Sequence, residues 1–198
     1  MRDTISRKRR LAVAGITTAA CVLAAAVPAA AQTGGSGPPG STTTTSTDPQ
    51  PAPVGPPGKA RIRKDGTAVA PSDAPPAVQS AIAAANAIHT YPYIWGGGHR
   101  TFYDRGYDCS GAVSYVLHAA GLLASPMTSG SLASSWGVPG HGRWITVFGN
   151  ASHAYMIIAG KRFDTSSGGD RWQQGSGPRW RKKKRPMSGF AMKYAPGL

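Results

Sequence analysis

The sequence contains no glutamate and only two cysteines, and these scarcities limit the chemistry that it can support. A metal centre needs several cysteine, histidine or carboxylate ligands close together, whereas the aspartates and histidines here are scattered along the chain. We therefore expect neither a metal ion nor a cofactor. Residues 96–98 are three glycines, but the lysine and hydroxyl residue of a phosphate-binding loop do not follow them, so nucleotide binding is not indicated.

The N-terminus has the three parts of an export signal. Arg2 and residues 7–10 supply positive charge, residues 11–27 form an apolar run, and residues 28–31 supply the small side chains of a cleavage site. An uncleaved membrane anchor is the alternative, but the run is alanine-rich and short for a bilayer span. We interpret residues 1–31 as a removable signal peptide, which predicts a secreted protein.

The cysteine count gains meaning once this segment is removed. Cleavage takes away Cys21 and leaves Cys109 alone, in a compartment where cysteines are normally paired in disulfides. A single exported thiol is either a buried, inert side chain or a reactive nucleophile. Composition does not distinguish the two.

The charge of the chain is strongly positive, which favours polyanionic partners. After removal of residues 1–31 there are 17 basic and 7 acidic side chains, a net charge of +10. Export favours anionic cell-wall polymers over nucleic acid as the partner. The candidate contact residues for such polymers are Arg179, Arg181, Lys182, Lys183, Lys184 and Arg185. A solvated loop before the last strand is the alternative interpretation.

The remaining chain divides into a linker and one domain. Residues 32–58 are rich in glycine, serine, threonine and proline and predict a disordered tether. Residues 59–198 have the length of a single domain and carry nearly all the large apolar side chains. No internal repeat is apparent, and we expect a monomer.

Turn residues and apolar spacing predict the elements of this domain. Two helices are expected, at about 75–89 with its N-cap at Ser72–Asp73, and at Ser110–Ala120. The expected strands are a short pair within 61–70 that turns at Asp65–Gly66, followed by 144–148, 154–159, 162–165 and 190–194, with a turn at Gly160–Lys161. Helices precede most strands, so the predicted class is α+β.

Cys109 stands at the predicted start of the second helix, where free backbone N–H groups favour a thiolate. A cysteine nucleophile needs a base, and four of the five histidines have ordinary structural explanations: His89 closes a helix, His99 and His141 lie in glycine-rich loops, and His118 lies within the second helix. His153 differs because it directly precedes an apolar strand, a rigid mount for a catalytic imidazole. Considered alone, a histidine in this position is structural more often than catalytic.

A family resemblance changes that balance. Residues 92–97 (Pro-Tyr-Ile-Trp-Gly-Gly), residues 108–111 (Asp-Cys-Ser-Gly) at the start of a helix, and His153 before an apolar strand resemble the NlpC family of papain-like cell-wall cysteine peptidases. The resemblance covers about residues 75–198. It implies a papain-like α+β fold, in which the helix carrying the cysteine packs on a small antiparallel sheet. It also implies hydrolysis of peptide bonds in the stem peptides of peptidoglycan.

The same resemblance implies roles for individual residues. Cys109 is the nucleophile and His153 the base, and a third polar residue that orients the histidine falls at Asp164, where many relatives have His, Asn or Gln. Thr165 is the fallback for this third residue, and a simple strand-end carboxylate is the alternative role of Asp164. The residues assigned to the oxyanion or the substrate are Tyr93, Asp108 and Ser110. In relatives the acid at the position of Asp108 can meet the free amine of a stem peptide. Trp95 is expected to have a packing role rather than a role in the chemistry.

The chain also departs from the family pattern. Relatives usually carry a Gly-Asp-Leu segment between the two catalytic elements, and residues 142–148 lack that acid. Two other functions therefore stay open: a catalytically weak or inactive wall-binding protein of the same fold, and a thiol amidase or acyltransferase.

Overall fold

A computed structural model describes residues 56–167 and 176–198, which lie within one compact unit, Pro49–Leu198. The predicted signal peptide and almost all of the predicted linker lie outside the described residues. Among the described residues, no helix is long and apolar enough to cross a membrane.

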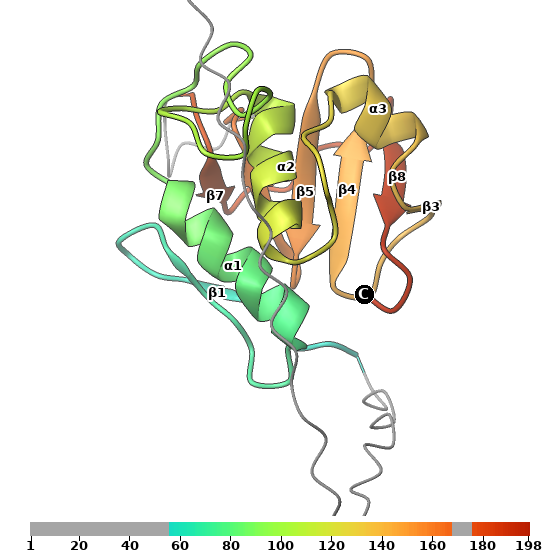
Figure 1. The fold of residues 1–198 in the computed structure, drawn as a ribbon. Coiled ribbons are helices and arrows are strands. Elements are labelled where there is room, and N and C mark those ends of the chain that lie inside the picture. The colour runs from blue at the N-terminus through green and yellow to red at the C-terminus, as the bar shows by residue number, and fades with distance from the viewer. Residues whose placement is uncertain (1–55, 168–175) are drawn as a thin grey trace, which may run out of the picture. The chain divides into compact units, whose positions relative to one another are not determined.

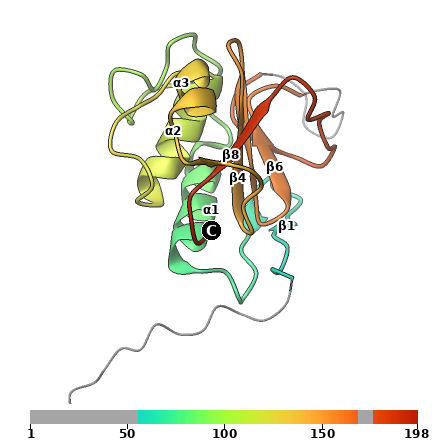
Figure 2. The same ribbon diagram turned by 90° about the vertical axis from the view of Figure 1, so that its right-hand side faces the viewer.

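Three helices cover one face of a sheet (Figures 1 and 2). They are α1 (Pro76–Ile88), α2 (Cys109–Ala119) and α3 (Ser129–Ser134). The apolar stripe predicted for α1 is buried, and α1 packs against α2. The N-cap predicted at Ser72–Asp73 is wrong: Pro75 precedes α1 without a side-chain cap, and the Asp73 carboxylate instead accepts a hydrogen bond of 2.9 Å from the Gly58 N–H.

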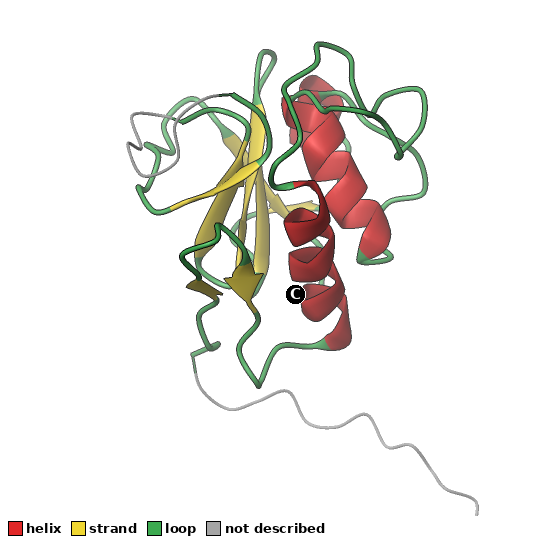
Figure 3. Ribbon diagram, turned by 90° about the vertical axis from the view of Figure 1, so that its left-hand side faces the viewer, coloured by secondary structure: helices red, strands yellow, loops and turns green. Residues whose placement is uncertain are grey.

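The sheet has six antiparallel strands in the order β3-β8-β4-β5-β6-β7, and Figure 3 shows it edge-on beside the helices. Its strands are β3 (Val138–Pro139), β4 (Ile145–Gly149), β5 (Ala154–Ile158), β6 (Lys161–Asp164), β7 (Arg179–Arg181) and β8 (Ala191–Tyr194). A separate antiparallel pair is formed by β1 (Arg61–Ile62) and β2 (Ala68–Val69). The α+β class and the cysteine-bearing helix on an antiparallel sheet are as predicted.

Most expected elements occur within one or two residues of their predicted bounds, and three short ones were missed: α3, β3 and β7. The turn between β5 and β6 is also shifted by one residue. Ala159 and Gly160 both have positive φ, at 44° and 73°, as a two-residue hairpin turn requires.

The two faces of the sheet are buried by different parts of the chain. Because successive side chains of a strand point to opposite faces, Met156 and Phe163 face the helices with the main core. Tyr155 points the other way, where its ring stacks on Phe148 at 4.6 Å and meets the edge of Phe190 at 5.1 Å. The segment before β8 therefore covers the face of the sheet opposite the helices at this point.

The start of α2 packs very closely against the preceding glycine-rich loop. A Cβ added at Gly111 would lie 2.0 Å from the Gly97 carbonyl oxygen, far inside van der Waals contact. Because this oxygen belongs to the backbone, a larger residue cannot be accommodated by rotating a side chain. The helix that carries Cys109 can approach the loop only with glycine at position 111.

We predict that Gly111→Ala destabilises the protein by about 1–3 kcal/mol, because overpacking forces the loop and helix apart. The matched control is Gly130→Ala in α3, where an added Cβ meets nothing within 4 Å. Alanine there should stabilise by about 0.5–1 kcal/mol through helix propensity. Urea unfolding followed by circular dichroism measures both, and equal effects of the two substitutions would contradict the packing argument.

Candidate functional site

Cys109 is the first residue of α2, and Asp108 caps that helix. The Asp108 carboxylate accepts a hydrogen bond of 2.7 Å from the Gly111 N–H, which satisfies one of the free amides of the first turn. Cys109 is 8% exposed. Its surroundings are polar, because the side chain of His153 and the backbone of Ala154 lie close enough to the sulfur to lower the pKa of the thiol.

A compact turn between β4 and β5 places His153 opposite the start of α2. Asn150 holds this turn, because its side-chain oxygen accepts hydrogen bonds of 2.9 Å from the N–H groups of both Ser152 and His153. The Asn150 amide also donates to the Gly189 carbonyl at 3.0 Å. The imidazole therefore projects from a fixed backbone at the end of a buried strand.

Asp164 completes a line of three side chains. Its Oδ1 lies 2.9 Å from Nε2 of His153 and accepts a hydrogen bond of 2.8 Å from the Ser166 N–H. Since Nε2 is engaged by Asp164, Nδ1 is the ring nitrogen left for the sulfur. The Thr165 hydroxyl is buried and has no hydrogen-bond partner among the described residues. Asp164, and not Thr165, is therefore the side chain behind the imidazole.

The charges of these three groups stabilise one another. Burial raises the pKa of the Cys109 thiol, but the hydrogen bonds from His153 and Ala154 and the charge of His153 bring this pKa below its usual value. Burial lowers the pKa of His153, but Asp164 and Cys109 together raise it to about 9. Burial likewise opposes ionisation of Asp164, yet His153 and Arg162 hold its pKa below the usual range. Each of the three groups therefore favours the charged form of its neighbour.

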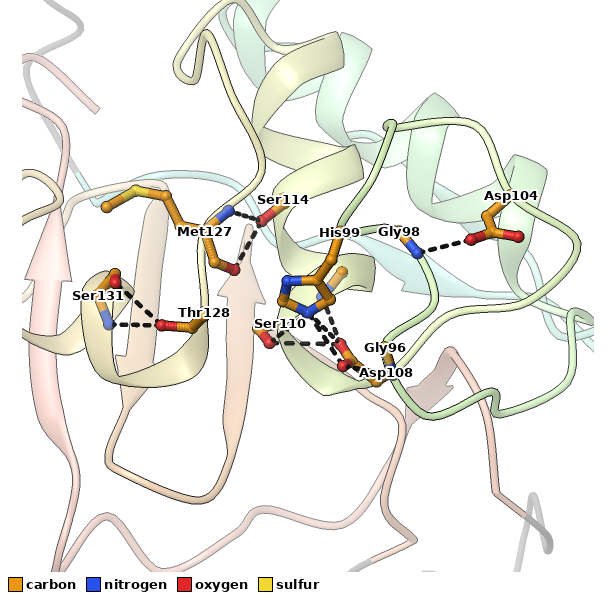
Figure 4. Close-up of polar contacts among 11 residues, drawn as sticks. Gly96, Gly98, His99, Asp104, Asp108, Ser110, Ser114, Met127, Thr128 and Ser131 are labelled. Atoms are coloured by element: carbon orange, nitrogen blue, oxygen red, sulfur yellow. Dashed lines mark hydrogen bonds and ion pairs between the residues drawn. The ribbon is translucent and has the colours of Figure 1, made fainter.

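A cavity of about 580 Å³ opens beside the sulfur, and we call it the nucleophile cavity. Around Cys109 it is lined by side chains of the glycine-rich loop and of the starts of α2 and α3: Trp95, His99, Asp108, Ser110, Thr128 and Ser129. Nε2 of His99 lies 3.0 Å from each Asp108 oxygen and 3.2 Å from Oγ of Ser110 (Figure 4). Asp108 and Ser110 thus meet in this cavity and are bridged there by an imidazole.

A second cavity of about 430 Å³ is lined by His153 and hydroxyl residues. Tyr93 is among these residues. Burial raises the pKa of its phenol, and the nearby negative charges of Cys109 and Asp108 raise it further. Tyr93 therefore lies within electrostatic range of Cys109 and Asp108, and its hydroxyl stays protonated and able to donate at neutral pH.

Two expectations from the sequence change at this site. Trp95 is 86% exposed at the rim of the nucleophile cavity, so the prediction that it packs is wrong. His99 was assigned only to a loop, yet it lies against Asp108. The Asp-Cys-Ser-Gly motif singles out residues 108–111 as candidates for the site. Nothing in the local pattern of residues 96–106, however, indicates which of their side chains contacts this motif.

The basic run that ends the domain does not lie free in solvent as a whole. Nη1 of Arg179 donates to the Tyr91 carbonyl at 2.9 Å, and the buried Arg181 donates to the Asp164 carbonyl at 3.3 Å. Arg185 pairs with the Asp164 carboxylate at 3.2 Å. Lys182, Lys183 and Lys184 are the exposed members. The anionic-polymer surface predicted from the sequence is thus reduced to these three lysines.

The described residues contain no group of three or more histidine, cysteine or carboxylate side chains that could hold a metal ion. The ionisable groups at the site are instead paired with one another.

We predict that iodoacetamide alkylates Cys109 at pH 7 faster than it alkylates an ordinary thiol, because the pKa of Cys109 is lowered. His153→Ala removes the main partner of the sulfur, so alkylation should slow by roughly tenfold at pH 7 and recover as the pH rises. Peptide mass spectrometry of the full chain follows Cys109 separately from Cys21. His141→Ala is the control, since in the described part of the chain His141 forms hydrogen bonds to Gly142 and Thr146 and none to Cys109. Equal rates in wild type and His153→Ala would contradict the activation of the thiol.

Comparison with known proteins gives structural matches only. No family model and no curated protein matches the chain. The structure is similar to a hypothetical invasion protein of Mycobacterium tuberculosis, with 21% identity, 60% of this chain and 63% of that chain covered, and a TM-score of 0.41. It is also similar to the peptidoglycan hydrolase RipB of the same organism, with 22% identity, coverages of 59% and 64%, and a TM-score of 0.42. A variant of the resuscitation promoting factor interacting protein RipA gives 21% identity, coverages of 71% and 70%, and a TM-score of 0.44. The chain thus spans less than two thirds of the length of the first of these structures.

Proposed function

We propose that the protein is an exported cysteine peptidase that hydrolyses peptide bonds in peptidoglycan stem peptides, with Cys109, His153 and Asp164 as its catalytic residues. One observation carries the proposal: the His153 imidazole lies 2.9 Å from the buried Asp164 carboxylate and is close enough to Cys109 to lower the pKa of the thiol. One cavity is lined by Cys109 and a second by His153, so there is space for a substrate beside both groups.

The reaction proposed for these three residues begins with attack of the Cys109 thiolate on the carbonyl carbon of the scissile bond. The His153 imidazolium then gives its proton to the leaving amine, and an acyl-enzyme remains on the sulfur. His153, now neutral, takes a proton from water, which attacks the acyl-enzyme and releases the new carboxylate. Asp164 fixes the orientation of the imidazole and stabilises its charged form through both steps.

Negative charge on the carbonyl oxygen needs nearby donors. Cys109 is the first residue of α2, so its backbone N–H has no acceptor within the helix and can serve this role. The Tyr93 hydroxyl is the proposed second donor, because it lies near the sulfur and stays protonated.

The substrate class rests on the motif resemblance, namely residues 92–97, residues 108–111 and His153. Positive charge after removal of residues 1–31 and the exposed Lys182–Lys184 suit an anionic wall matrix. Export itself depends on the predicted signal peptide. The competing hypothesis, a wall-binding protein without catalysis, requires an unactivated Cys109, whereas the pKa of this thiol is lowered by its partners.

We predict that Cys109→Ala lowers the release of soluble muropeptides from purified peptidoglycan by roughly 10³-fold or more, since no other group replaces the nucleophile. The matched control is Cys21→Ala, which removes the other cysteine and should leave the rate unchanged. Liquid chromatography with mass spectrometry measures the products and distinguishes peptide hydrolysis from amidase cleavage or acyl transfer. Release that persists in Cys109→Ala would exclude the proposed mechanism.

Asp164 and Thr165 are adjacent, and substitutions at the two positions separate their roles. Asp164→Ala should reduce the hydrolysis rate by roughly 10²–10⁴-fold, because the imidazole loses its acceptor. Thr165→Val should leave the rate within about threefold, since it replaces an unpaired buried hydroxyl by a methyl group of the same shape. Rates are compared after circular dichroism confirms folding. The reverse order of the two effects would show that the third residue has been misassigned.

A further inference from the structure

The Asp164 carboxylate is completely buried, and its two oxygens have different partners. Oδ1 faces His153 and the Ser166 N–H. Oδ2 lies 3.3 Å from Nη1 of Arg162 and 3.2 Å from Nη1 of Arg185. One oxygen therefore serves the imidazole, while the other is held by two guanidinium groups.

Both arginines are fixed by further contacts. Arg162 precedes Asp164 by two residues on β6, so the two side chains share a face of the sheet. Its side chain is 3% exposed, and Nη2 donates to the Ser167 carbonyl at 2.7 Å. Arg185 comes from the segment before β8 and lies over the rings of Tyr155 and Phe190, with its guanidinium carbon 5.6 and 5.4 Å from the ring centroids. Such cation–π contacts favour this placement of the charge.

A fully buried carboxylate tends to take up a proton, because burial disfavours its charged form. Once protonated, Asp164 could no longer stabilise an imidazolium. Guanidinium groups keep their charge at any pH that a folded protein tolerates, so they compensate the carboxylate permanently. His153 alone could not do so, because its own charge changes during the proposed reaction.

We infer that Arg162 and Arg185 are positioning residues that keep the Asp164 carboxylate ionised and directed at His153, so that the end of the basic run forms part of the catalytic apparatus. This inference rests on the proposed function for the chemistry that it supports. It also assigns a role to Arg185 that differs from the polymer contact expected from the sequence.

The titratable and charged groups around the His153–Asp164 pair come from four parts of the chain. Cys109 lies beside His153 at the start of α2, and Asp164 and Arg162 come from β6. Arg185 approaches from the segment before β8. Tyr155 on β5 is neutral at all relevant pH values, because burial raises the pKa of its phenol to about 12.

The test is Arg185→Gln in the full chain, with the rate of Cys109 alkylation by iodoacetate measured from pH 4 to pH 10.5. This anionic reagent reacts best when a thiolate and an imidazolium coexist, so a plot of the wild-type alkylation rate against pH should be bell-shaped. Its fall on the alkaline side (the alkaline limb) reports loss of the imidazolium near pH 9. Without Arg185, the carboxylate attracts the imidazolium without competition, and the alkaline limb should move up by about 0.5–1 pH unit. The acid limb should move up as well, because Asp164 becomes easier to protonate.

Two control variants separate charge from other effects. Lys184→Gln removes the same charge from the neighbouring exposed residue and should leave both limbs in place. Arg185→Lys keeps the charge and should restore most of the wild-type profile. If Arg185→Gln does not fold, Arg185→Met retains the aliphatic contact with Tyr155 and Phe190 and should show the same shift.

The outcomes distinguish this inference from the proposed function. If folded Arg185→Gln or Arg185→Met has the same alkaline and acid limbs as wild type, the inference is overturned, even if the overall rate or the melting temperature falls. A wild-type chain whose Cys109 gives no bell overturns the proposed function instead.

Discussion

The proximity of Cys109 and His153 is the constraint on which the site depends, because it joins two elements that are far apart in the sequence. Cys109 starts α2 and His153 precedes β5, and the two side chains meet only if α2 packs on β5 in one position. That position is set by core side chains such as Val113, Val116 and Met156, which are buried between the helix and the sheet. A close-packed interior does not deform smoothly, so the same packing that stabilises the fold also fixes the distance between the Cys109 sulfur and the His153 imidazole.

Asp108 has a more structural role than the family resemblance implies. Its carboxylate accepts hydrogen bonds from the N–H groups of Gly111 and Gly96 and contacts His99. These contacts tie the glycine-rich loop to the start of α2. An incoming amine would have to share or replace the contact with His99, so the nucleophile cavity of this protein differs from one in which the acid is free. The absence of the Gly-Asp-Leu segment is a second departure, and it leaves β4 intact.

Much of the fold was predictable from the sequence, because its main signals are local. Apolar spacing and Gly121 define α2, and alternating or continuous apolar runs define β4, β5 and β8. Two motifs and their order in the sequence also singled out Cys109 and His153 as candidate site residues. The missed elements have weak local signals: α3 is a short, serine-rich helix with few apolar side chains, and β7 lies in a run of basic residues that normally indicates a solvated loop. The exposure of Trp95 and the contact of His99 depend on how a glycine-rich loop folds back, which no periodicity encodes.

Asp164 shows how a carboxylate behind a histidine changes the surroundings that it needs. A neutral imidazole or amide in this place can orient a histidine without adding charge to the interior. Asp164 stabilises the imidazolium more strongly, but a buried carboxylate requires compensating cations. Arg162 could be anticipated, since it lies two residues before Asp164 on the same strand face. Arg185 lies 21 residues beyond it, and only the folded chain brings it there. Asp164 and these two arginines therefore form one unit: with a neutral side chain at position 164, two largely buried guanidinium groups would lose the carboxylate that they share.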